Sequence, residues 1–296
     1  MGLRERLVDP RSPDRRPRRA AYALPTLFTA GNVFLGYAAI LRAIHAASLA
    51  ASGLPGVAEN FTLAASFIGA AVFLDGLDGY IARLTNTASD FGREMDSLAD
   101  VISFGIAPAV LAYTWGIQLV DLTFAPQLRD LIQETGAFFS FLFLLCGAVR
   151  LARFNVTKNP VPKNPGRPDR KYFVGMPIPA GAGMVAAMVY AFGGEPLAWW
   201  PLALAWVCLL ALLGFLMVST WRYYSFKGLK LEKARSPLIL ILLGALIFGI
   251  RIYGQALLLV LATFYVASGI AIRAGGVLRR KLHHVTPPRS PEHQIG

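Results

Sequence analysis

The chain has 296 residues, of which 55% are hydrophobic and 16% are charged. Soluble domains carry about 25% charged residues, so this composition excludes an ordinary soluble globular protein. Long stretches without charge alternate with short stretches rich in Arg and Lys, which is the pattern of membrane spans separated by loops. The net charge of +12 resides in those loops and tails. We therefore expect anionic lipid headgroups, and no nucleic acid, as partners of the basic residues.

Eight apolar segments follow one another along the chain. Several reach the roughly 20 residues that a helix needs to span the hydrocarbon layer, and the fifth and seventh are the shortest. The sequence therefore predicts an all-α, polytopic integral membrane bundle of about eight transmembrane helices; a count of six would require two segments to be re-entrant or fused. The segments cover approximately 26–48, 61–84, 95–117, 135–154, 177–193, 198–219, 237–251 and 255–273.

Polar ends flank this apolar region. Residues 1–23 are rich in Arg and Pro and have no apolar core followed by a cleavage site, which favours a basic cytoplasmic tail over a signal peptide. The membrane domain is expected to occupy residues 24–273, and a second cytoplasmic tail is expected to occupy residues 274–296.

The distribution of basic residues predicts the orientation. The stretches 155–176 and 220–236 each hold five Lys or Arg, whereas 49–60 and 194–197 hold none. Because cytoplasmic loops carry the excess of Lys and Arg, both basic stretches and both termini are expected in the cytoplasm. The protein is thus expected in a membrane of the bacterial inner-membrane type.

Four aspartates stand in the second and third apolar segments. Asp75 and Asp78 are three residues apart, and Asp96 and Asp100 are four apart, so each pair shares one face of a helix. Since consecutive short-looped helices run antiparallel, the two faces can meet at a similar depth. The sequence therefore predicts four carboxylates that converge near the cytoplasmic face.

Such a cluster requires positive charge. One Asp at the centre of a spanning helix costs about 2.5–3.5 kcal/mol on insertion scales, and neighbouring carboxylates repel one another. Arg83 and Arg93 are the only cations nearby in the sequence. A bound divalent metal supplies the missing charge, and carboxylate oxygens suit Mg²⁺, Mn²⁺ or Ca²⁺. Hydrated charges at helix ends and an ion pathway remain as alternatives.

The spacing of these residues resembles the signature of the CDP-alcohol phosphotransferase family. That family transfers a substituted phosphate from a CDP-linked donor to an alcohol and releases CMP. The matching positions are Asp75-x-x-Asp78-Gly79-x-x-Ala82-Arg83, eight residues, and Gly92-x-x-x-Asp96-x-x-x-Asp100.

The resemblance implies a role for each of these positions. Asp75, Asp78 and Asp96 would bind the metal, with Mg²⁺ or Mn²⁺ as the expected cofactor and Ca²⁺ as a further option. Asp100 would bind or face the metal and act as the general base. A homodimer is also implied. The residues that would border the CDP moiety are Asp78, Gly79, Ala82, Arg83 and Gly92.

Two further stretches narrow the resemblance to the membrane-embedded phosphatidylserine synthases of that family. They are LPTLFTAGNVFLGYAA at 24–39, and RLARFNV at 150–156 followed by YFVGMPIPAGAG at 172–183. The resemblance implies transfer of a phosphatidyl group from CDP-diacylglycerol to the hydroxyl of L-serine.

The basic residues near the end of the fourth apolar segment also bear on which alcohol is the acceptor. A serine carboxylate needs a cationic partner, and Arg provides two parallel hydrogen bonds. Arg150, Arg153 and Asn155 are therefore the expected acceptor-binding residues. Glycerol phosphate or inositol phosphate could use the same arginines, whereas choline favours an aromatic cage. A cation transporter that uses the aspartates as its ion site is the alternative from a different class.

Overall fold

The computed structural model describes residues 19–85, 90–122, 125–158, 172–224 and 254–275. In this part of the chain, six helices are long and apolar enough to cross a membrane, and a shorter apolar helix lies among them. The expected polytopic helical membrane bundle is confirmed. Seven of the eight expected segments coincide with described helices, while the segment expected at 237–251 lies outside the described residues.

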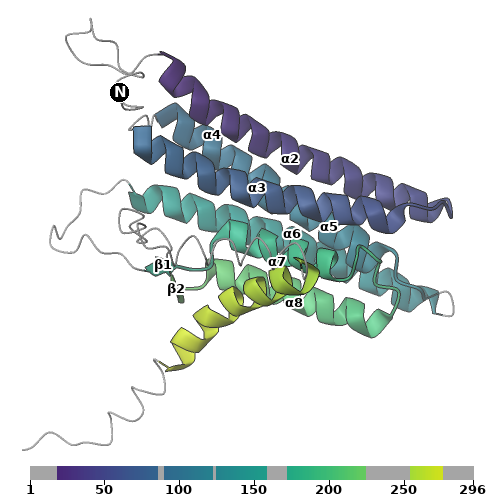
Figure 1. The fold of residues 1–296 in the computed structure, drawn as a ribbon. Helices are drawn as coiled ribbons and strands as arrows, with labels where there is room; N and C mark the ends of the chain where they lie inside the picture. Colours follow the sequence, from purple (N-terminus) through teal and green to yellow (C-terminus); the bar gives the residue numbers. More distant parts are fainter. Residues whose placement is uncertain (1–18, 86–89, 123–124, 159–171, 225–253, 276–296) are drawn as a thin grey trace, which may run out of the picture.

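The helices lie side by side as an elongated bundle (Figure 1). The last described helix, yellow in Figure 1, crosses the others at an angle. The elements are α2 (Arg19–Ala51), α3 (Val57–Thr85), α4 (Asp90–Asp100), the π-helical turn η1 (Val101–Ile106), α5 (Ala107–Tyr113), the π-helical turn η2 (Thr114–Gln118), α6 (Pro126–Lys158), β1 (Tyr172–Val174), α7 (Ile178–Ala191), α8 (Trp200–Val218), β2 (Arg222–Tyr224) and the helix Gly254–Gly275.

Small side chains allow α2 and α3 to pack closely as an antiparallel hairpin. Their buried residues recur every three or four positions, which places them on one face of each helix. Small residues permit close van der Waals contact, which drives helix association where lipid removes the hydrophobic effect between helices. The buried positions include Ala39, Ala43 and Ala46 on α2 and Ala64, Ile68 and Ala71 on α3.

The elements α4, η1, α5 and η2 form one helical rod whose hydrogen-bonding pattern changes three times, from α to π, back to α and again to π. Its membrane span is Glu94–Gln118. Pro108 lies near the start of α5 and has no backbone N–H to donate, which favours a local change of register. Asp100 is the last residue before the π-helical turn, so that turn begins directly at the carboxylate pair of this helix.

A small antiparallel sheet, absent from the expected all-helical fold, lies beside the bundle. Val174 of β1 pairs with Arg222 of β2, and each strand has three residues. Tyr223 of β2 is fully buried and its hydroxyl donates to the carbonyl of Val266, 3.5 Å away. Burial, followed by the charge of Tyr265, raises the pKa of Tyr223 to about 12, so this hydroxyl keeps its proton. The sheet thereby holds the helix Gly254–Gly275 against the bundle.

Gly36 is expected to be essential for the contact between α2 and η1. An added Cβ at this position would lie 2.7 Å from the Cα of Ser103, which is backbone and cannot rotate away. Gly36→Ala should therefore lower stability by about 1–3 kcal/mol, the usual cost of overpacking. Gly69→Ala is the matched control, because its Cβ would meet nothing within 4 Å. Thermal unfolding in detergent measures both; equal melting temperatures would contradict the close contact.

Candidate metal centre

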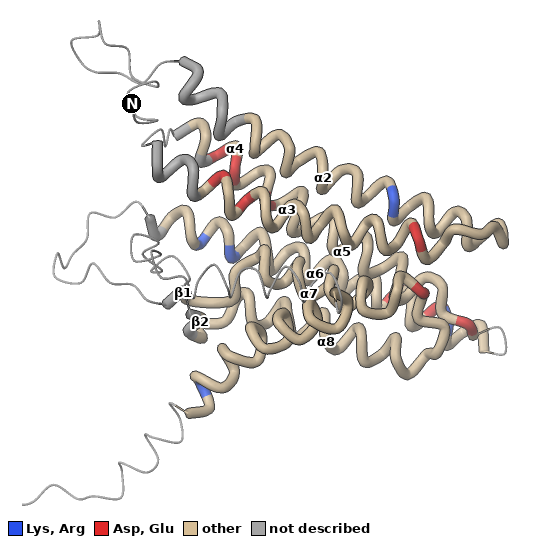
Figure 2. Tube along the Cα trace, in the orientation of Figure 1, with Lys and Arg blue, Asp and Glu red and all other residues tan. Residues whose placement is uncertain are grey.

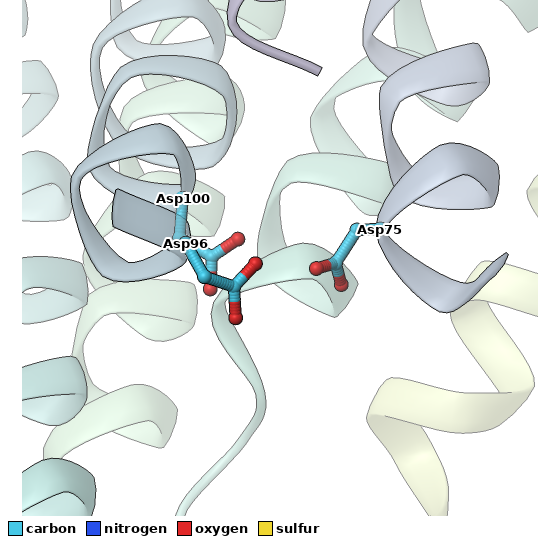
Figure 3. A group of neighbouring side chains, drawn as sticks. All are labelled: Asp75, Asp96 and Asp100. Atoms are coloured by element: carbon cyan, nitrogen blue, oxygen red, sulfur yellow. The ribbon is translucent and has the colours of Figure 1, made fainter. Parts of the chain in front are cut away.

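Three of the four aspartates meet between α3 and α4. One carboxylate oxygen from each of Asp75, Asp96 and Asp100 lies within 4.8 Å of the others. Asp96 and Asp100 project from successive turns of one helix, and Asp75 projects toward them from the facing helix (Figure 3). Asp100 is buried, while the other two are partly exposed. The structure thus brings together three of the four carboxylates that were predicted to converge.

The fourth aspartate, Asp78, is held by α2 instead. Its Oδ2 accepts a hydrogen bond of 2.7 Å from the Thr29 hydroxyl, and the side chain is 7% exposed. Its other oxygen, Oδ1, is buried and has no hydrogen-bond partner among the residues that the structure describes. An acceptor atom in this state is costly unless something binds it. Asp78 is therefore available as a further ligand beside the three-carboxylate group.

The carboxylates gather at one end of the bundle. Figure 2 shows acidic positions on α3 and α4 near the end at which α2 begins, and basic positions on α6 at the same end. The group offers only carboxylate oxygens, a donor set that fits Mg²⁺, Mn²⁺ or Ca²⁺ and does not favour the softer metals. The residues present therefore fit a hard divalent cation.

Glycines leave open space next to this group. A Cβ added to Gly76 or Gly79 would meet none of the described atoms within 4 Å, so packing of the described helices does not require glycine there. This observation supports a ligand that approaches the backbone of α3. Gly92 lies in the first turns of α4. Ala82 and Arg83 belong to α3, but their side chains lie outside the described part of the structure.

Arg150 is the buried cation next to the carboxylates. It lies on α6, is 7% exposed, and its guanidinium carbon is 5.4 Å from the centre of the Phe154 ring. The Asp100 carboxylate and, from the last described helix, the Tyr265 hydroxyl both lie within range of an electrostatic interaction with it. Arg150 therefore borders the carboxylate group on the side of α6.

Arg153 and Asn155, expected at the acceptor site, make contacts with the protein itself. Arg153 donates to the carbonyls of Val218 (2.9 Å), Val174 (3.2 Å) and Ser219 (3.3 Å). It thus joins α6 to the end of α8 and to β1. Another bond links α6 to α4, because the amide of Asn155 donates to the Ser97 hydroxyl at 2.7 Å.

An apolar cavity of about 570 Å³ lies next to the candidate site, between α3, α7 and the last described helix. Its wall includes Val72 and Phe73, which precede Asp75 on α3, and Tyr265 from the opposite side. Tyr265 therefore lines the cavity and also approaches Arg150. The sequence analysis missed Tyr265, because a tyrosine within an apolar helix resembles an ordinary interfacial aromatic residue.

Comparison with known proteins finds one family and several close relatives. Residues 22–211 match the family described as CDP-alcohol phosphatidyltransferase. A CDP-diacylglycerol–serine O-phosphatidyltransferase of Helicobacter pylori is 38% identical over 77% of this chain and 83% of its own length. A protein of the same description from Bacillus subtilis is 33% identical over 72% of this chain and 96% of its own length. An archaetidylserine synthase of Methanothermobacter thermautotrophicus is 34% identical over 54% of each chain.

Arg153→Lys should destabilise the protein. Lysine keeps the charge but lacks the planar guanidinium whose N–H groups donate to three carbonyls at once. Each lost hydrogen bond contributes about 0.5–1.5 kcal/mol, so a lower melting temperature is expected. Arg129→Lys provides a matched control, since Arg129 is an exposed arginine of the same helix. Thermal unfolding in detergent separates the two variants, and an unchanged melting temperature for Arg153→Lys would show that the carbonyl contacts contribute little.

Proposed function

The chain belongs to the CDP-alcohol phosphatidyltransferase family, and we propose that it transfers the phosphatidyl group of CDP-diacylglycerol to the hydroxyl of L-serine, giving phosphatidylserine and CMP. The meeting of Asp75, Asp96 and Asp100 beside the buried Arg150 carries this proposal. The bacterial relatives named for this reaction support serine as the acceptor, because their similarity extends over most of the chain.

In the proposed reaction, Asp100 is the general base. It accepts the proton of the serine hydroxyl while the serine oxygen forms a bond to the lipid-bearing phosphorus. The bond between that phosphorus and the oxygen bridging to the CMP phosphate breaks, and CMP leaves. A divalent cation at Asp75, Asp78, Asp96 and Asp100 would neutralise the diphosphate charge, with Mg²⁺ or Mn²⁺ proposed and Ca²⁺ as an option. The side chains contribute mainly by positioning the reactants.

We assign the serine carboxylate to Arg150. This guanidinium is buried next to Asp100, so a serine bound there can present its hydroxyl to the base. The three carbonyl bonds of Arg153 and the Ser97 contact of Asn155 suit residues that fix the position of α6. Both residues thus shape the acceptor site through the segments that they hold.

The donor is proposed to extend from the cytoplasm into the bilayer. Gly79, Ala82, Arg83 and Gly92 would border the CDP moiety, with Asp78 at its inner end. The diacylglycerol part would enter from the side and place apolar chain in the cavity between α3, α7 and the last described helix. The apolar lining of this cavity favours such an occupant, because burying apolar chain there removes it from water.

The membrane, the orientation and the oligomeric state are proposed from the family resemblance and from the distribution of basic residues. The site would face the cytoplasm of a bacterial-type inner membrane, with residues 24–273 as the catalytic unit between the tails 1–23 and 274–296. A homodimer would be the assembled form. Glycerol phosphate and inositol phosphate are the competing acceptors, since Arg150 can bind phosphate as well as carboxylate.

The decisive measurement is CMP release by the purified protein with CDP-diacylglycerol and a panel of alcohols. Serine should support release, whereas choline, inositol phosphate and glycerol phosphate should support far less. EDTA should abolish the reaction and Mg²⁺ or Mn²⁺ should restore it, because the clustered carboxylates need a cation. Release with another alcohol alone would replace serine as the acceptor, and full activity in EDTA would refute the metal site.

Asp100→Asn should reduce turnover by at least about 100-fold, the usual contribution of general base catalysis. Asparagine keeps the shape and one acceptor oxygen but cannot take the serine proton. Binding of CDP-diacylglycerol should change much less, and titration of the donor onto the purified variant measures it. Near-normal turnover in this variant would remove Asp100 from the role of base.

A further inference from the structure

Asn32 on α2 carries a buried amide that no described residue pairs with. Its side chain is 1% exposed, and neither Nδ2 nor Oδ1 has a hydrogen-bond partner within the described part of the chain. Its backbone carbonyl accepts a 2.9 Å bond from the Ser103 hydroxyl. Leaving a buried amide unpaired costs about 1–3 kcal/mol by mutational measures, and most such groups in proteins are paired. The residue therefore requires an explanation other than packing.

Its neighbours place Asn32 at the depth of the carboxylates. Thr29, one turn earlier on the same face of α2, binds Asp78 of α3. Because α2 and α3 are antiparallel, moving from Thr29 to Asn32 corresponds to moving from Asp78 to Asp75, about 4.5 Å along each helix. On the other side, Ser103 lies one turn beyond Asp100. Asn32 thus lies between the two helices that carry the aspartates, at the inner end of the group.

Asn32 cannot easily turn away from this position. Gly36, one turn further along α2, lies so close to η1 that a Cβ would be 2.7 Å from the Cα of Ser103. Together with the bond from Ser103 to the Asn32 carbonyl, this contact fixes the face that α2 presents. The backbone of Asn32 is therefore fixed against η1, and its buried side chain starts from a defined position.

The chemistry of the site indicates what the amide binds. Aspartates offer acceptor atoms only, and phosphate oxygens also accept, so direct contact with a phosphate requires an N–H or O–H donor. Among the neighbouring described donors, the Thr29 hydroxyl donates to Asp78 and the Ser103 hydroxyl donates to the Asn32 carbonyl, while the Arg150 guanidinium is assigned to the serine carboxylate. The Asn32 Nδ2 donor is unengaged and buried.

We propose that Asn32 binds the lipid-side phosphate of the CDP-linked donor, with Nδ2 donating to a phosphate oxygen. The inference rests on the proposed function for the identity of the donor. Of the two phosphates of the donor, we choose the lipid-side one because of the depth of Asn32 in the bundle. Asn32 is level with Asp75, whereas Gly79 and Ala82, which are assigned to the cytidine end, lie nearer the cytoplasmic end of α3. Asn32 is thus a binding residue for the group that is transferred.

The test uses Asn32→Leu, which has nearly the same volume and no hydrogen-bonding atom. The full-length protein is purified in detergent and its binding of CDP and of CMP is measured with Mn²⁺ and without acceptor. Affinity for CDP should fall about 10- to 100-fold, the effect of one hydrogen bond to a charged group. Affinity for CMP, which lacks the lipid-side phosphate, should be unchanged. Mn²⁺ binding, followed by electron paramagnetic resonance, should also be unchanged.

Stability distinguishes ligand binding from a structural role. Replacing an unpaired buried amide with an apolar residue of similar size is neutral or stabilising, so the melting temperature of Asn32→Leu should be equal or higher. If leucine fails to fit, Asn32→Ala removes the same donor without adding bulk and should show the same selective loss of CDP affinity. Ser140→Ala is the matched control, because Ser140 of α6 also carries a buried, unpaired oxygen but lies away from the carboxylates.

Each outcome has a distinct meaning. Unchanged CDP affinity in both variants would overturn the proposal, and an equal loss for CDP and CMP would overturn the lipid-side assignment. A loss of Mn²⁺ binding or a lower melting temperature in both variants would make Asn32 a structural residue. If the wild-type protein binds CDP but uses an acceptor other than serine, only the acceptor assignment fails. If the wild-type protein does not bind CDP, the proposed function fails and this inference fails with it.

Discussion

The need to hold several carboxylates within a low-dielectric membrane protein determines much of this structure. Each ionised carboxylate loses hydration when it is buried, and several together repel one another. Neighbouring helices offset part of this cost. Helix α2 supplies a hydroxyl that donates to Asp78, and α6 places the buried Arg150 within electrostatic range of Asp100. The proposed cation would complete this compensation, so metal binding and the stability of the acidic end are expected to be linked.

The same requirement explains why polar contacts at this end join different helices. The Thr29 bond links α2 to α3, the Ser103 bond links η1 to α2, and the Asn155 bond links α6 to α4. Away from this end, α2 and α3 pack through small side chains, whose contacts depend on shape. The carboxylate group is thus supported from three sides by side chains that are not part of it, which is what precise placement of reactants requires.

The sequence was sufficient to predict the bundle and the convergence of three of the four aspartates, because both depend on local periodicity, whereas the bond between Asp78 and Thr29 of α2 was not foreseen. Asp75 converges with Asp96 and Asp100 once two apolar helices are known to be neighbours. Contacts between distant segments were beyond this reasoning: Arg153 was expected to bind the acceptor, yet its described partners are carbonyls more than 60 residues away at Val218 and Ser219. The three-residue strands were also too short to give an alternating pattern.

Tyr265 has a consequence for how members of this family can diverge. The carboxylates lie within the stretch 22–211 that matches the family, whereas Tyr265 belongs to a helix beyond it. This helix nevertheless forms one wall of the apolar cavity and approaches Arg150. One wall of the apolar cavity and the carboxylate group are thus encoded in separable parts of the chain. Exchanging the last helix between relatives therefore offers a way to alter lipid preference while the aspartates stay untouched.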